Sequence, residues 1–368
     1  MTTEEIKFPL YAKVTIFLIG LFALTAILFI AKSIIIPLVF ATIIAIMLNP
    51  VVDFLVRIKI NRVVAIAIVM MLTFIVLFAF VSLVISQISR FSDSWPILVE
   101  KFTGIINQNI SDAASYFDKD PQKIHEWITK VQGEIINTST TAIGQTLVIV
   151  GSGLVVLFLL PVYIFLILFY QPILLEFIHR LFSTDYHSKV NEIVNQVKKV
   201  IQQYLFGLLI EAVLVAILDT AALLILGIEY ALLLGIFGAL LNMIPYIGGL
   251  VAVAMPMMVA LVTKTPVYAI YVMAAYYFIQ LIDNNYIVPY IVASKVKINA
   301  LFSIIVVLAG NALWGVPGMF LSIPLLAIVK LICDHIEPLK PLGFLLGDTM
   351  PPILKIKLIL KKAKSISI

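Results

Sequence analysis

The chain of 368 residues has few charged side chains and a single cysteine. Asp, Glu, Lys and Arg make up 12% of it, whereas apolar types make up 62% and the mean hydropathy is +1.13. A water-soluble domain with so few charges could not cover this much apolar surface. The single Cys333 excludes an intramolecular disulfide framework and a cysteine-rich metal or iron–sulfur site, and its simplest role is that of a small buried hydrophobe.

The motifs of several enzyme classes are also missing. The sequence has no G-x-x-x-x-G-K-[ST] loop for ATP, no H-E-x-x-H or Cys/His cluster for a metal and no G-x-S-x-G hydrolase elbow. We therefore expect no enzyme activity, no cofactor and no metal site. The net charge is only +5 and the basic residues gather beside apolar runs, which favours membrane orientation over binding of nucleic acid.

What the sequence does have is about eight long apolar runs separated by short polar joints. A membrane-spanning helix needs about 20 largely apolar residues to cross the hydrocarbon layer. The runs lie at residues 14–31, 33–48, 63–86, 146–170, 206–227, 231–262, 266–282 and 300–332. We therefore predict an all-α, polytopic integral membrane protein, whose first partner is the lipid bilayer.

Lysine and arginine in the short joints predict the orientation of the spans. Arg57, Lys59 and Arg62 follow the second run, Lys295 and Lys297 follow the seventh, and the tail is basic. If all of these lie in the cytoplasm, both termini are cytoplasmic and the acidic stretch between runs three and four faces outward. All of these basic joints can lie in the cytoplasm only if runs 231–262 and 300–332 each enter and leave the membrane on the same side, as hairpins.

The same pattern predicts how the chain is organised along its length. The expected parts are residues 1–86 with the first three spans, 87–145 as a helical extracytoplasmic insert, 146–205 with span four and an amphipathic cytoplasmic helix, 206–334 as the transport core, and 335–368 as a basic cytoplasmic tail. The insert has apolar residues at spacings of three and four, typical of amphipathic helices. It is interpreted as a pair of helical extensions of spans three and four, with a ligand- or partner-binding unit as the alternative.

Two breaks interrupt the later apolar runs. The first, residues 242–249, contains Pro245, Gly248 and Gly249, and the second, residues 310–318, contains three glycines and a proline. Backbone can break at membrane depth only where protein or a watery cavity covers it. Each break is interpreted as the tip of a re-entrant hairpin near the substrate site, with a tight loop between two short spans as the alternative.

Few polar residues remain within apolar surroundings. Glu211 and Asp219 lie eight positions apart in run 206–227, about 80° apart around a helix. Intramembrane acids are unfavourable and are functional candidates by default, although Glu211 could instead lie at the membrane interface. Gln280, Asp283, Asn284 and Asn285 stand at the end of run 266–282 and form either a cluster that binds a polyhydroxylated ligand or a cation, or a helix cap.

The polar positions around the breaks resemble those of a known family. The pattern comprises Gln203, Gly207, Gly235, Gly238, Asn242-x-Ile244-Pro245-x-Ile247-Gly248, Asp283-Asn284-Asn285, Pro289, Gly315-x-x-Gly318-Met319 and Ile323-Pro324-Leu325. It resembles the autoinducer-2 exporter family of bacterial membrane proteins over essentially the whole chain, with the specific motifs in the C-terminal half. Gly249 stands where many members have proline, and Asn299-Ala300 where many have His-Pro, so a mechanism that needs that histidine is not carried over.

The resemblance implies a multi-pass protein of the bacterial inner membrane and a homo-oligomer, with a pentamer as one candidate. It also implies export of autoinducer-2, as in some members, or exchange of sodium or lithium for protons, as in others. The leading hypothesis is a transporter of a small polar solute, with its site between the two hairpins. The residues predicted to line that pathway are Asn242, Pro245, Tyr246, Gly248, Gly249, Asp283, Asn284, Asn285, Pro289, Asn311, Gly315 and Gly318.

Two other hypotheses stay open. In the first, the protein exchanges Na⁺ for H⁺, with Asp219 or Glu211 as the coupling carboxylate. In the second, it is a membrane scaffold or receptor that binds a partner through residues 87–145. A scaffold does not require two broken apolar hairpins, so this last hypothesis is the least favoured.

Overall fold

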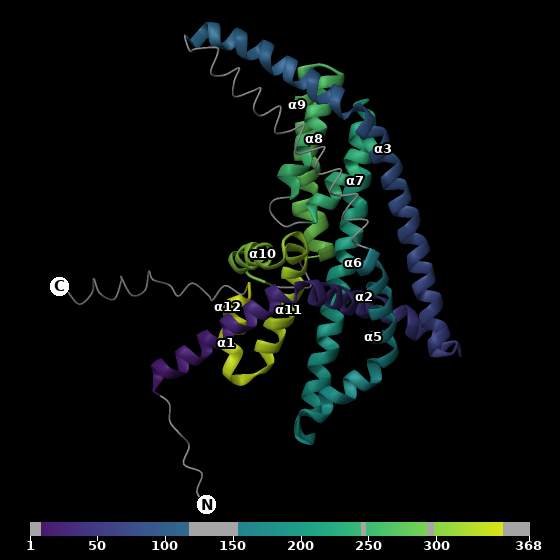
Figure 1. Cartoon of the computed structure of the whole chain (residues 1–368), viewed down its shortest axis with the longest axis vertical. Helices are drawn as coiled ribbons and strands as arrows, with labels where there is room; N and C mark the ends of the chain where they lie inside the picture. The colour runs from purple at the N-terminus through teal and green to yellow at the C-terminus, as the bar shows by residue number, and fades with distance from the viewer. Residues whose placement is uncertain (1–8, 118–153, 244–247, 293–297, 349–368) are drawn as a thin grey trace, which may run out of the picture.

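The computed structural model describes residues 9–117, 154–243, 248–292 and 298–348. Within these ranges the chain forms helices joined by short turns, and its β-structure is limited to one isolated bridge between Ile298 and Gly347. Six of the described helices are long and apolar enough to cross a membrane, and several shorter apolar helices accompany them. The predicted all-α polytopic class is therefore confirmed (Figure 1).

The N-terminal helices are α1 (Leu10–Ile30), α2 (Lys32–Arg57), α3 (Arg62–Phe117) and α5 (Leu154–Arg180). An apolar core joins α2, α3 and α5, whereas α1 contacts α2 and α10 (Ala300–Trp314). Small residues of α2, such as Ala41 and Ala45, lie against Ile66 of α3 and Leu168 of α5. Their small size lets the helix backbones approach closely, which is how apolar helices associate in a membrane.

Helix α3 continues far beyond the third apolar run. It extends without interruption from Arg62 to Phe117, so the first part of the predicted insert is a helical extension of that span. Leu98 of this extension packs with residues of α6, α7, α8 and α9, and Tyr230 donates a hydrogen bond of 2.7 Å from its hydroxyl to Ser94 Oγ. The rest of the predicted insert, residues 118–145, lies outside the described residues.

Helix α6 (His187–Ile225) follows the short turn η1 (Thr184–Tyr186). It joins the amphipathic stretch and the apolar run 206–227 in one continuous helix. Its buried residues recur at three- and four-residue intervals and include both predicted carboxylates: Ile201, Tyr204, Leu208, Glu211, Val215, Asp219 and Leu223. This stripe faces the rest of the protein, as the helical period requires.

The first predicted break separates α7 (Ala231–Asn242) from α8 (Gly248–Thr263). Helix α9 (Pro266–Ile282) then begins with proline, whose missing N–H is not needed in a first helical turn. It continues as the wider π-helix η2 (Asp283–Val292), which contains Pro289. Figure 1 shows α6, α7, α8 and α9 side by side along the long axis of the molecule.

The second predicted break is the joint between α10 (Ala300–Trp314) and α11 (Val316–His335). Gly315, the joint itself, has φ +66° and ψ −145°, a conformation that residues with a Cβ rarely adopt. The two helices pack tightly, because Gly310 and Gly318 face each other without side chains. After α11 come η4 (Glu337–Leu339) and α12 (Lys340–Leu346), and α12 packs back on α11.

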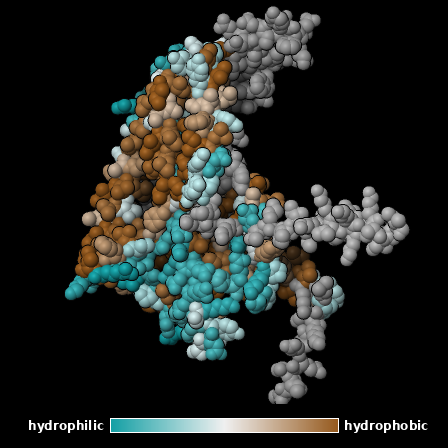
Figure 2. All heavy atoms as spheres, turned by 180° about the vertical axis from the view of Figure 1, so that it is seen from behind, coloured by the Kyte–Doolittle hydropathy of each residue, from teal (hydrophilic) through white to brown (hydrophobic). Residues whose placement is uncertain are grey.

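The surface agrees with a protein that meets both lipid and water. Many large apolar side chains are exposed, including Phe22 at 77% and Phe78 at 77%. Seen from behind, apolar residues cover the upper part of the molecule and hydrophilic residues gather in its lower part (Figure 2). The helix breaks at residues 242–248 and at Gly315 occur where the sequence predicts them; that each pair enters and returns on one side of the bilayer stays a prediction.

Candidate functional site

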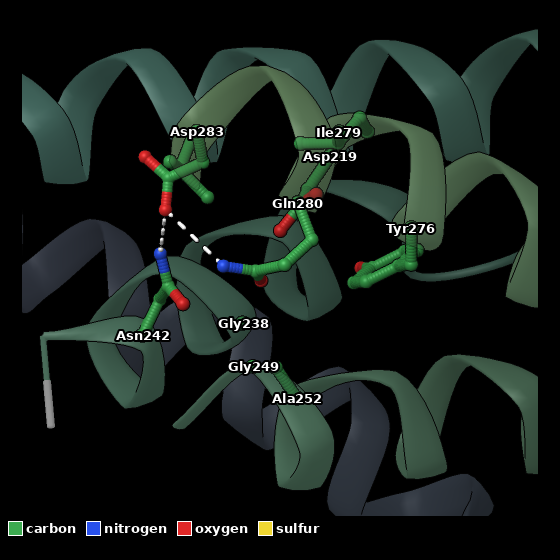
Figure 3. A pocket seen from close by; sticks show the side chains of 10 residues that line it. Asp219, Gly238, Asn242, Gly249, Ala252, Tyr276, Ile279, Gln280 and Asp283 are labelled. Carbon is green, nitrogen blue, oxygen red and sulfur yellow. Dashed lines mark hydrogen bonds between the residues drawn. The ribbon is translucent and has the colours of Figure 1, made fainter. Parts of the chain in front are cut away.

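Asp283 is the centre of a buried polar cluster. It lies where α9 passes into η2, and only 2% of its surface is exposed. Asn242 Nδ2 donates to Asp283 Oδ2 at 2.9 Å, and Gln280 Nε2 donates to the same oxygen at 3.3 Å (Figure 3). The other carboxylate oxygen, Oδ1, is buried and has no hydrogen-bond partner among the described residues.

The end of α7 and the start of α8 bring the first of these amides into place. Asn242 is the last residue of α7, and the chain returns at Gly248. A Cβ on Gly248 would collide with the backbone of Leu241, so glycine allows α8 to begin against the end of α7. Pro245 and Tyr246, also predicted for the site, lie outside the described residues.

Asp219 lies close to this cluster on α6. It is 3% exposed, and a Cβ added to Gly238 of α7 would lie 3.0 Å from its Oδ2 and 3.6 Å from the hydroxyl of Tyr276. The absence of a side chain at Gly238 therefore lets the carboxylate and the phenol approach the same point. The Tyr276 hydroxyl is itself buried without a hydrogen-bond partner in the described part of the chain.

Glu211 is buried on the same stripe of α6, with 7% of its surface exposed. Its side chain therefore lies between helices, and its depth in the membrane stays a prediction. In the described ranges, Lys, Arg and His form ion pairs only with Glu176, Asp334 and Glu337, and none of them pairs with Glu211, Asp219 or Asp283. Three carboxylates thus lie within the helical core without a cationic side chain to balance them, an arrangement typical of proton or cation pathways.

A small cavity connects Asp219 with the Asp283 cluster, and Glu211 does not line it. Its volume is about 10 Å³, about the space that one water molecule needs. It is lined by Val215, Asp219, Gly238, Asn242, Gly249, Ala252, Tyr276, Ile279, Gln280 and Asp283. In this conformation the cavity accommodates water or a small cation, and an organic solute would require α6, α7, α8 and α9 to separate.

Other predicted residues occupy different positions near the cluster. Asn284 Oδ1 accepts a hydrogen bond of 3.3 Å from Gln280, which links it indirectly to Asp283. Asn285 is exposed and donates to Leu281 O of its own helix. Pro289 lies in η2 and is exposed. Asp283 is the C-cap residue of α9, and the chain continues from it as the π-helix η2.

The second break contributes no residue to the lining of this cavity. Asn311 is exposed, and Gly318 is buried against Gly310. The neighbouring Trp314 donates from Nε1 to Leu28 O of α1 at 3.0 Å. The joint at Gly315 thus lies beside α1, while the first break faces α6 and α9.

Among the polar residues of the site, sequence reasoning missed Tyr276, and it named Gly238 only as part of the family pattern. Buried residues of α9 and η2 follow a helical stripe through Val272, Tyr276, Ile279, Asp283 and Ile287. This periodicity links Tyr276 to Asp283 and could have identified it. Nothing in the sequence could show that Gly238 lies opposite Asp219. No group of three metal-ligating side chains occurs among the described residues.

Comparison with known proteins supports a transporter. The family model for AI-2E family transporters matches residues 16–337. The putative transport protein YrrI of Bacillus subtilis is 23% identical over 312 residues, covering 83% of this chain and 87% of that protein. The AI-2 transport protein TqsA of Escherichia coli is 23% identical over 330 residues, covering 86% of this chain and 90% of that protein. The chain is a multi-pass membrane protein with a general transport role, and it belongs to the AI-2E transporter family.

Proposed function

We propose that the protein moves a small polar solute across the membrane through the cluster centred on Asp283. The observation that carries this proposal is the unequal pairing of its carboxylate. Oδ2 accepts two amide hydrogen bonds, whereas the buried Oδ1 has no partner among the described residues. A buried polar atom without a partner is unfavourable, so it is available to a ligand that donates a hydrogen bond.

The chemistry of the lining defines the class of solute. Asn242 and Gln280 provide amide groups, Asp219 and Asp283 provide carboxylate oxygens, and Tyr276 provides a hydroxyl. Such a set binds hydroxyl groups of a polyhydroxylated molecule from several directions. Because the relative TqsA is named as an AI-2 transport protein, autoinducer-2 is the first solute to test.

The test is flux of autoinducer-2 in proteoliposomes that contain purified protein. We expect Asp283→Ala to abolish flux and Asn242→Ala to lower it by about tenfold or more, while the apparent melting temperature in detergent shows that both variants fold. Asp185→Asn is the matched control, because Asp185 is exposed in η1 and far along the chain from the cluster. Wild-type flux from both cluster variants would remove this site from the pathway.

A second candidate, exchange of Na⁺ for H⁺, is favoured by the burial of Asp219 and Glu211 without a cationic partner in the described ranges. Carboxylate oxygens bind either a proton or a hard cation such as Na⁺, and the cavity has the size of one water or ion. A carboxylate that binds one or the other in turn couples their movements in opposite directions.

A pH-sensitive dye inside proteoliposomes measures this exchange. Addition of Na⁺ should cause proton movement in wild-type protein and in Glu229→Gln, whose carboxyl group is exposed in the turn between α6 and α7. Asp219→Asn should lose the response, because an amide cannot bind and release the proton. An unchanged response in Asp219→Asn would reject Asp219 as the coupling carboxylate.

The orientation of the chain also belongs to the proposal. Basic residues in the joints after the second and seventh apolar runs and in the tail support cytoplasmic termini. A bacterial inner membrane and a homo-oligomeric assembly are proposed from family membership.

A further inference from the structure

Several described helices contain proline, and at two of these prolines the carbonyl left without its helical donor lies beside another helix. Pro50 lies inside α2 and Pro172 lies inside α5. Proline has no N–H, so the carbonyl four residues earlier loses its usual helical donor. The carbonyls affected are those of Ile46 and Leu168. A carbonyl that is packed between helices without a partner is unfavourable, because it has lost its hydrogen bonds to water and gained none.

In both cases a side chain from another helix donates to that carbonyl. Gln202 Nε2 of α6 lies 2.7 Å from Ile46 O. Arg62 Nη2, at the start of α3, lies 2.8 Å from Leu168 O and also 2.8 Å from Gln171 Oε1. Each polar side chain thus donates to the carbonyl that has lost its helical N–H donor because of a proline. The same kind of hydrogen bond therefore occurs at two prolines, which lie on different helices and have different donors.

The bond from Gln202 lies within an apolar contact between α2 and α6. Ile43 of α2 packs in one cluster with Ile201 and Leu205 of α6, on either side of the amide. Apolar side chains resist separation of the two helices but allow one to slide or rotate against the other. A directional bond to one carbonyl removes that freedom. It thereby fixes the position of the helix that carries Glu211 and Asp219.

We propose that Gln202 and Arg62 are positioning residues that replace the N–H missing at Pro50 and Pro172. Gln202 fixes α2 against α6, and Arg62 fixes α5 against the start of α3. The inference does not depend on which solute or ion the protein moves. Removal of one interhelical hydrogen bond in a membrane protein lowers the ratio of folded to unfolded molecules by about threefold on average, and by up to about twentyfold.

A double-mutant cycle tests the assignment at Pro50. Gln202→Leu removes the donor, and Pro50→Ala supplies the missing backbone N–H to the Ile46 carbonyl. We expect Gln202→Leu to lower the folded-to-unfolded ratio in detergent by threefold or more when Pro50 is present. In the Pro50→Ala background the same substitution should leave the ratio unchanged, because the carbonyl already has its helical donor.

A distance measurement separates positioning from stability alone. In a Cys333→Ala background, the only native cysteine is removed, and spin labels can be attached at Phe54 of α2 and Phe206 of α6, which are 62% and 42% exposed. The distribution of label-to-label distances should broaden in Gln202→Leu. It should narrow again in the double variant with Pro50→Ala.

Gln203→Leu is the matched control, one residue along α6. Its effect on stability and on the distance distribution should be the same with Pro50 and with Pro50→Ala. Equal losses from Gln202→Leu in both backgrounds would overturn the proposal, since Gln202 would then act through packing and not through the opened carbonyl.

Arg62 and Pro172 provide an independent double-mutant cycle if a variant at Pro50 fails to fold. Arg62→Met keeps most of the side-chain length and removes the donors, and Pro172→Ala restores the backbone N–H for Leu168. The stability loss from Arg62→Met should be smaller in the Pro172→Ala background by threefold or more in the folded-to-unfolded ratio. A loss independent of Pro172 would overturn the assignment of Arg62.

Discussion

The two amides that hold Asp283 are not equivalent, and their difference gives a graded prediction. Asn242 Nδ2 lies 2.9 Å from Asp283 Oδ2, at the usual distance for an N–H···O bond, whereas Gln280 Nε2 lies 3.3 Å from the same oxygen. The first bond is therefore the stronger of the two. We expect Asn242→Ala to impair transport more than Gln280→Ala.

The magnitude follows from the kind of bond that each variant removes. A hydrogen bond to a charged group contributes about 1.5–3 kcal/mol, which corresponds to about a 10- to 150-fold effect on binding. The Gln280 bond ends on the same oxygen but is longer than the usual N–H···O range, so its loss should have the smaller effect, about tenfold or less. At subsaturating solute, the initial flux should fall by about these factors in Asn242→Ala and Gln280→Ala respectively.

The assay is initial flux in proteoliposomes over a range of solute concentrations, with equal amounts of folded protein. Gln280→Ala with a loss as large as that of Asn242→Ala would refute the ranking by distance.

Two further predictions concern the helix contacts that hold the core together. Gly318→Val should destabilise the protein by about 1–3 kcal/mol, because a side chain there would collide with the Gly310 carbonyl. Gly20→Val is the control, because Gly20 has open space around it, and thermal unfolding in detergent compares the two variants. Leu223→Ala, at a fully buried position (0% exposed), should cost about 2–5 kcal/mol, whereas Leu224→Ala, 64% exposed on the adjacent position of α6, should change stability little. Similar melting temperatures within either pair would contradict the packing described for these helices.

The sequence predicted the places where helices break, because local chemistry decides them. Asn242 ends α7 and Gly248 begins α8, on either side of the first predicted break. Gly315 has a positive φ at the second. Proline and glycine change the backbone wherever they occur, so their effects can be read without knowledge of distant contacts. The intramembrane acids could be recognised in the same way, since an unpaired carboxylate in an apolar run stands out in any membrane protein.

Helix lengths were less predictable from hydropathy. Both α3 and α6 extend well beyond their apolar runs, because a helix continues through amphipathic residues without a break. Hydropathy identifies the part of a helix that lies in lipid. It does not identify where the hydrogen-bonded helix ends.

By itself, the sequence determined that this is an all-α membrane protein, where its later helices break and which acids lie among apolar residues. Only the tertiary structure decided which of these groups meet: Asn242 with Asp283, Gly238 with Asp219 and Gln202 with the Ile46 carbonyl. The physical reason is that hydropathy and backbone preferences act over a few residues. A hydrogen bond between residues distant in sequence depends on how whole helices rotate and pack, which no local pattern specifies.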